Sequence, residues 1–157
     1  MQLYLVQHGE ALAKNLDPDR ALSEAGRKEV LRLASFLAGK VRVARVLHSG
    51  KTRARQTAEI LAAEVAPKLS VEQFCGLSPN DHVEPFVQHV EEWGEDLLVV
   101  GHLPFMAKLV ARLAIGSGEK SVVDYRPGSI VCLETGEGPG WQVQWMIRPE
   151  LLPESPQ

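Results

Sequence analysis

The sequence lacks the features of several protein classes. It has only two cysteines among 157 residues, too few for a framework of disulfide bonds. No apolar run approaches the ~20 residues of a membrane-spanning helix, and the N-terminus has no signal-peptide pattern. The formal net charge is −3 and no run of lysine and arginine exceeds two residues, which disfavours a nucleic-acid partner. We therefore expect a cytoplasmic protein without a membrane or nucleic-acid partner, with both thiols, Cys75 and Cys132, in the core.

The composition that remains is typical of one globular domain. Hydrophobic residues make up 45% of the chain and charged residues 24%. The length is close to the ~150 residues of a single domain, which buries roughly 70% of its unfolded surface. We expect one domain over residues 1–148 and a flexible tail over residues 149–157, which contain three prolines.

Short apolar runs alternate with helical patterns along most of the chain. The runs predict four strands, at 2–6, 43–48, 69–74 and 97–101. Apolar residues at helical spacing predict four helices, at 23–38 with Ser23 as N-cap, 51–64, 82–93 and 103–114. This alternation predicts a mostly parallel sheet that is covered by helices on both faces.

The C-terminal part has a different pattern. Residues 129–134 and 141–147 predict two strands joined by a glycine-rich turn. In the second of them Trp141, Val143 and Trp145 alternate with polar or flexible residues, which is typical of a half-exposed antiparallel strand. The predicted fold class is therefore α/β: a three-layer α/β/α sandwich with a mostly parallel central sheet and an antiparallel C-terminal strand pair.

Residues with useful chemistry follow three of the predicted parallel strands. His8 follows the first strand, Arg53 comes soon after the second, and His102 follows the fourth. In such sheets ligands bind beyond the carboxyl ends of the strands. Each residue alone fits an ordinary loop or surface position, but together they predict a single anion site.

Helix geometry distinguishes Arg53 from Arg55 as the residue of that site. Two residues are ~200° apart around a helix, so both cannot face one pocket. Arg53 shares a face with Gln56 and Thr57 at i+3 and i+4. Ser49 and the first amides of this helix are further candidate donors to an anion.

Two other kinds of site are disfavoured. Gly50-Lys51-Thr52 resembles the end of a nucleotide-binding P-loop, but position 45 is arginine where that motif needs glycine. His82 and His89 lie two helical turns apart, too far to share a metal ion easily, and no cysteine cluster exists. We therefore expect neither a metal nor another cofactor.

Four motifs, in this order, resemble the histidine phosphatase superfamily, and within it the short bacterial phosphohistidine phosphatases of the SixA type. They are His8-Gly9-Glu10, Arg20-Ala21-Leu22-Ser23 with Gly26, Ser49 with Arg53-Ala54 and Gln56-Thr57, and Gly101-His102-Leu103-Pro104. The resemblance covers roughly residues 1–147 and implies a phosphoglycerate mutase-like fold.

The resemblance also implies the roles of the site residues. His8 would attack phosphorus and become a transient phosphohistidine, while His102 and Arg53 would act as positive clamps on the phosphoryl oxygens. The implied phosphate-binding set is Gln7, Gly9, Arg20, Ser49, Arg53 and His102. These roles suit phosphoryl transfer, which depends mainly on positioning and charge neutralisation and needs no metal where protein cations supply the charge. The implied substrate is a phosphorylated protein of the phosphotransfer type, and the product is inorganic phosphate.

The sequence departs from the family pattern at the residue before the nucleophile. Gln7 stands where the family has arginine, so we expect slower turnover, because an amide brings no charge. Glu10 and Asp81 are candidates for a leaving-group acid or a water-orienting group, and Glu84 is a further carboxylate nearby. Two alternatives stay open: a catalytically impaired module that binds phosphoproteins, and a phosphatase of small phosphate esters.

Overall fold

A computed structural model describes residues 1–154 of the chain, and within this part six strands form one sheet in the order β3-β2-β4-β1-β5-β6. The strands are β1 (Gln2–Gln7), β2 (Arg45–His48), β3 (Val71–Gln73), β4 (Leu97–Gly101), β5 (Ile130–Thr135) and β6 (Trp141–Ile147). The helices are α1 (Glu24–Leu37), α2 (Thr52–Val65), α3 (Glu84–Trp93) and α4 (Phe105–Ile115), followed by a 3-10 helix, η1 (Pro149–Leu151).

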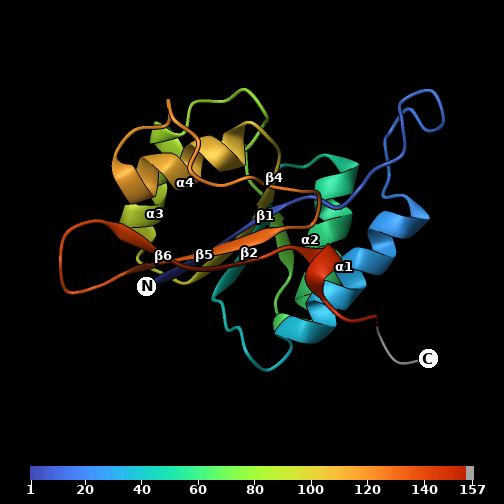
Figure 1. Ribbon diagram of the computed structural model, residues 1–157, viewed down its shortest axis with the longest axis horizontal. Coiled ribbons are helices and arrows are strands. Elements are labelled where there is room, and N and C mark those ends of the chain that lie inside the picture. The colour runs from blue at the N-terminus through green and yellow to red at the C-terminus, as the bar shows by residue number, and fades with distance from the viewer. Residues whose placement is uncertain (155–157) are drawn as a thin grey trace.

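The sheet has a parallel and an antiparallel part. Strands β3, β2, β4 and β1 pair in parallel, whereas β5 runs antiparallel to β1 and β6 runs antiparallel to β5. Helices α1 and α2 cover one face of the sheet and α3 and α4 cover the other (Figure 1). This arrangement confirms the predicted three-layer α/β fold.

Two apolar cores lie on the two faces of the sheet, because successive side chains of a strand point to opposite sides. In β1, Leu3 and Leu5 pack with α3 and α4, while Tyr4 and Val6 pack with α1 and α2. The parallel strands are buried on both faces, which explains why they are apolar without interruption.

The regular alternation predicted for β6 is wrong in its second half. The register with β5 shifts between Cys132 and Leu133, which is a β-bulge. The extra residue moves Trp141 into the core beside α3 and α4, whereas Trp145 packs on the α1 and α2 side. Val143 is 41% exposed.

The two thiols have different environments. Cys132 is buried in β5, as predicted, but Cys75 is exposed, so the prediction that both are core residues is wrong. Cys75 follows β3, a strand of three residues at the edge of the sheet, in the loop between Phe74 and Leu77, which both pack toward α3 and α4.

Met1 lies beside β5, where its carbonyl accepts the backbone N–H of Thr135 at 3.1 Å, and the segment after β6 lies beside α1. Ser23 caps α1 as predicted, because its side chain accepts a hydrogen bond from the backbone N–H of Gly26 at 3.0 Å. Within the segment expected to be a tail, Pro149–Leu151 form η1, which lies beside α1 (Figure 1). The last part of that expected tail, residues 155–157, lies outside the described residues. No helix of residues 1–154 is long and apolar enough to cross a bilayer.

Candidate active site

The carboxyl ends of β1, β2 and β4 bring the two predicted imidazoles together. In the parallel register Gln7 pairs with Gly101, so the residues that follow, His8 and His102, leave neighbouring strands at the same level. Their ring centroids are 4.9 Å apart, with the ring planes tilted by 52°. The backbone N–H of His8 also donates to the carbonyl of Gly101 at 3.0 Å. Two residues far apart in sequence therefore share one site.

Arg53 and Ser49 complete this cluster from the connection between β2 and α2. The Nε–H of Arg53 donates to Nε2 of His8 at 3.3 Å. The Oγ of Ser49 lies 2.6 Å from Nε2 of His102. Arg55 lies on another face of α2, where it is half-exposed and pairs with Glu59 at 3.6 Å, as the helix geometry predicts.

The tautomer of His8 follows from its two hydrogen bonds. Its Nδ1 lies 2.7 Å from the carbonyl oxygen of Gly9, which can only accept, so Nδ1 carries the proton. Its Nε2 accepts from Arg53 and therefore has the lone pair that a nucleophile needs. Burial first, and then the charges of Arg53 and Arg20, lower the pKa of His8 to about 4, although the Gly9 carbonyl acts in the opposite direction. At pH 7 His8 is thus neutral, with its Nε2 lone pair on the side of Arg53.

His102 is also a neutral imidazole near pH 7. It is 2% exposed, and burial, followed by the nearby His8, Arg53, Lys51 and Arg20, lowers its pKa to about 3. Its Nδ1 is enclosed and has no hydrogen-bond partner among the described residues. Without an anion the structure favours a neutral His102, whereas a neighbouring anion would favour its charged form, so the role of a positive clamp on bound phosphate stays a prediction.

Arg20 lies within electrostatic range of the cluster but is held by its own loop. Its Nε–H donates to the carbonyl of Leu12 at 3.0 Å, and its backbone has a left-handed φ of +50°. The side chain of Asp17 holds the same loop by accepting the backbone N–H of Ala21 at 2.9 Å. The Arg20 charge contributes to the lowered pKa values of His8 and His102.

Gln7 occupies the end of β1, directly before the nucleophile. It is 8% exposed, and its Oε1 is enclosed without a hydrogen-bond partner among residues 1–154. A buried acceptor without a partner costs free energy, so Oε1 would gain from a hydrogen-bond donor, and binding of phosphate through the Nε2–H groups of Gln7 stays a prediction. Gln7 therefore directly precedes His8 at the end of β1 and brings no charge to that position.

Both backbone polar groups of Gly9 have hydrogen-bond partners within the site. Its N–H donates to Oγ1 of Thr57 at 3.0 Å, and its carbonyl accepts from His8. A side chain at this position would come within 2.7 Å of Val30 in α1. The Gly9 N–H is thus already engaged by Thr57, and the expected role of Gly9 in binding phosphate stays a prediction.

The candidate carboxylates have other partners. Glu10 is exposed, and its Oε1 accepts from Oγ of Ser23 at 3.0 Å. Asp81 accepts the backbone N–H of Ser78 at 2.9 Å, inside its own turn. Glu84 pairs with Arg112. Within the described part of the chain, no hydrogen bond or ion pair joins these carboxylates to the two imidazoles or to Arg53.

Two contributors to the site were not assigned a role by the sequence analysis. Thr57 was placed on the face of Arg53 by helical spacing, but its bond to Gly9 joins residues 48 positions apart, which no local pattern reveals. His48, at the end of β2, is 4% exposed, and its Nδ1 accepts the backbone N–H of Gly50 at 3.0 Å. That bond shapes the turn that carries Ser49.

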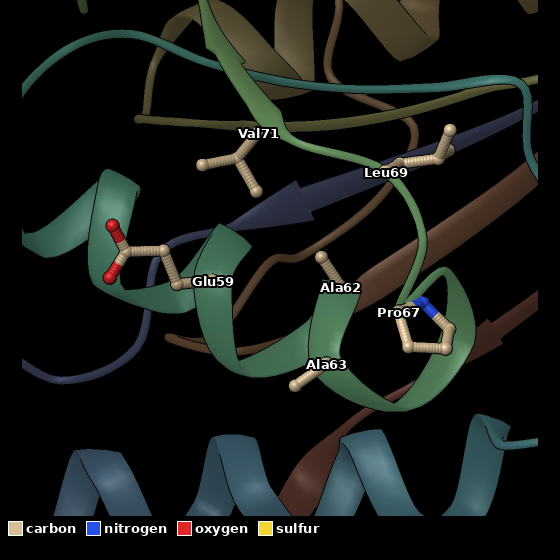
Figure 2. A pocket seen from close by; sticks show the side chains of 6 residues that line it. All are labelled: Glu59, Ala62, Ala63, Pro67, Leu69 and Val71. Atoms are coloured by element: carbon tan, nitrogen blue, oxygen red, sulfur yellow. The ribbon is translucent and has the colours of Figure 1, made fainter.

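The site can hold a tetrahedral anion through cations and polar hydrogens. In residues 1–154 no group of three or more histidine, cysteine, aspartate and glutamate side chains could hold a metal ion. A separate hollow of about 220 Å³ lies between the C-terminal half of α2 and β3 (Figure 2). Its lining is mainly apolar with one carboxylate, which does not suit a phosphoryl group: Glu59, Ala62, Ala63, Pro67, Leu69 and Val71.

Comparisons with known proteins identify the family of the chain. The family model of the histidine phosphatase superfamily (branch 1) matches residues 3–78. Phosphohistidine phosphatase SixA of Escherichia coli is 33% identical over 155 residues, which cover 91% of this chain and 93% of that protein. A SixA homolog of Haemophilus influenzae is 25% identical, with 85% and 87% covered. A structure of the protein histidine phosphatase SixA complexed with tungstate is 28% identical and has a TM-score of 0.82, covering 95% and 97% of the two chains.

Proposed function

This chain belongs to the histidine phosphatase superfamily and is of the SixA type, and from this we propose that it removes phosphate from a phosphohistidine on another protein. One observation carries the proposal: the lone pair on Nε2 of His8 faces Arg53 beside a second imidazole, His102. Nucleophilic attack on a phosphoryl group requires such an arrangement, with a free lone pair beside groups that can neutralise the charge of the phosphoryl oxygens.

The first step is transfer of the phosphoryl group to His8. Nε2 of His8 attacks phosphorus and forms an N–P bond, while the N–P bond of the substrate breaks and its imidazole leaves with the electron pair. A substrate imidazole that is protonated on its other nitrogen leaves as a neutral ring. His8 keeps its Nδ1 proton, which the Gly9 carbonyl accepts at 2.7 Å, and this bond stabilises the charge on the phosphorylated ring.

The phosphoryl oxygens are bound by the groups around Nε2. Arg53 already contacts that nitrogen and supplies one guanidinium charge, and Arg20 supplies a second. His102, whose ring centroid lies 4.9 Å from that of His8, and the amide N–H groups of Gln7 are further expected binding groups. In the second step water attacks phosphorus, the His8 N–P bond breaks, inorganic phosphate leaves and His8 returns to its neutral form.

The carboxylates support a phosphohistidine rather than a phosphate ester as substrate. An alkoxide leaving group needs an acid, and the candidates Glu10, Asp81 and Glu84 are engaged by Ser23, Ser78 and Arg112. An imidazole leaving group carries its own proton and needs no such acid. The short connections around the site, such as residues 74–83 between β3 and α3, suit a phosphorylated side chain on a phosphotransfer-type protein. A cytoplasmic location stays a prediction.

The test is release of inorganic phosphate from a protein phosphorylated on histidine. We expect release by the wild-type protein and a loss of at least about a thousandfold in His8→Ala, because the nucleophile is missing. Equal release by both proteins would contradict the proposal. If both proteins bind the phosphoprotein but neither releases phosphate, the result would instead support a phosphoprotein-binding module whose catalysis is impaired by Gln7. Faster release from sugar phosphates would support a small-ester phosphatase.

A further inference from the structure

We propose that Gln56 and Thr57 are positioning residues, which set where His8 and Arg20 stand relative to Arg53. Among residues 1–154 neither side chain has a hydrogen bond to His8 or His102, yet each binds a backbone amide of a different loop of the site. The inference rests on the proposed function, since it concerns the relative positions of His8, Arg20 and Arg53 in the same site.

Thr57 closes a ring of hydrogen bonds between the nucleophile and the arginine. Its hydroxyl donates to the carbonyl of Arg53 at 2.8 Å and accepts the N–H of Gly9 at 3.0 Å. The Gly9 carbonyl accepts from Nδ1 of His8, and Nε2 of His8 accepts from Arg53. The path therefore returns to the residue where it began. A shift of the Gly9 peptide would turn the His8 ring away from Arg53.

The surroundings of Thr57 leave its hydroxyl as the acceptor that the Gly9 N–H needs. Thr57 is fully buried, so no solvent can replace its bond to Gly9. The only hydrogen of the hydroxyl goes to the Arg53 carbonyl, which leaves a lone pair for the Gly9 N–H. Val30 of α1 packs against Gly9 from the other side. Valine would fill the same space as threonine but would leave the Gly9 N–H without an acceptor.

Gln56 holds the second loop in the same way. Its Oε1 accepts the backbone N–H of Leu22 at 2.8 Å. Leu22 is 7% exposed, forms an antiparallel bridge with Ala11, and lies two residues after Arg20. The Gln56 side chain therefore anchors the base of the loop that carries Arg20, whose charge acts on both imidazoles.

Helical geometry explains why the two residues act together with Arg53. Positions i, i+3 and i+4 lie on one face of a helix, so a single turn of α2 faces the nucleophile loop and the Arg20 loop. This turn of α2 thus carries Arg53 and also holds the loops of His8 and Arg20. A purely structural role would need only the packing volume of these side chains, not their polar atoms.

The test compares variants that keep or remove those polar atoms. Thr57→Val is expected to lower kcat about 10- to 100-fold with little change in KM, since a small misplacement of a reacting group has effects of this size. It should also shift or broaden the Nδ1–H resonance of His8. Thr57→Ser keeps the hydroxyl and should stay within about threefold of wild type. Gln56→Met should raise the KM and the Kd for inorganic phosphate about three- to tenfold through Arg20.

The control is Ala62→Gly, a change on α2 at the hollow of Figure 2, remote from the ring of bonds. It destabilises the helix but should leave kcat and the His8 resonance unchanged. The proposal is overturned if Thr57→Val retains wild-type kcat and resonance, or if Ala62→Gly reproduces its effects. Should Thr57→Val fail to fold, an unchanged phosphate Kd in Gln56→Met overturns it. The Nδ1–H resonance of His8 and the Kd for inorganic phosphate can be measured without turnover. These two measurements therefore test the inference even if the wild-type protein is inactive.

Discussion

Acidification is expected to leave His8 neutral over a range in which an ordinary histidine becomes charged. Burial, together with the nearby Arg53 and Arg20, lowers its pKa from 6.5 to about 4. At pH 5.5 an unperturbed imidazole is about 9% neutral, whereas His8 should be about 97% neutral. The nucleophilic form therefore persists about two and a half pH units further into acid than for a solvent-exposed histidine.

Nitrogen-15 NMR of the imidazole rings between pH 8 and 4.5 measures this directly, with His8→Asn to assign the signals. The expected spectrum shows protonated Nδ1 and unprotonated Nε2 down to about pH 5, as the contact with the Gly9 carbonyl requires. A titration midpoint near 6.5 would refute the reasoning. Saturating inorganic phosphate should raise the midpoints of His8 and His102, because an anion favours the charged imidazole. Unmoved midpoints would mean that phosphate binds elsewhere.

Three further outcomes follow from individual contacts. Gln7→Arg should raise kcat/KM about tenfold by adding a charged donor at the site; no gain would contradict the placement of this side chain. Gly26→Ala should lower the unfolding free energy in urea by roughly 1–3 kcal/mol, because its Cβ would come within 2.1 Å of the carbonyl oxygen of Glu10, and an unchanged midpoint would contradict that packing. The unfolded chain binds more protons than the folded one below pH 6.5, so stability should fall by about 2 kcal/mol from His8 and a similar amount from His102 between pH 7 and 5. His8→Asn should remove about half of that fall, and an equal fall in both proteins would count against the lowered pKa.

The sequence was sufficient to predict the layers of the fold and the meeting of the two imidazoles. Uninterrupted apolar runs such as Leu97–Val100 indicate strands buried on both faces, and helices between them require parallel strands. Once parallel pairing is inferred, His8 and His102 must leave the sheet at one edge. Arg53 could be preferred to Arg55 because helix geometry needs only local spacing.

The features that could not be predicted depend on long-range contacts. The bond between Gly9 and Thr57 and the bulge that separates Trp141 from Trp145 arise only when distant segments pack. Burial likewise decides the charge of His102, which a pattern in the sequence cannot show. Cys75 is exposed because β3 is short and lies at the sheet edge, a consequence of strand order.

A crystal structure with bound tungstate is the decisive test of whether the cluster around Nε2 of His8 binds phosphate, because tungstate is a tetrahedral oxyanion like phosphate. We expect tungsten next to Nε2 of His8, with oxygen contacts from Arg53, His102 and the amide N–H groups of Gln7. Tungstate bound at another surface, with these side chains in their present contacts, would contradict this expectation.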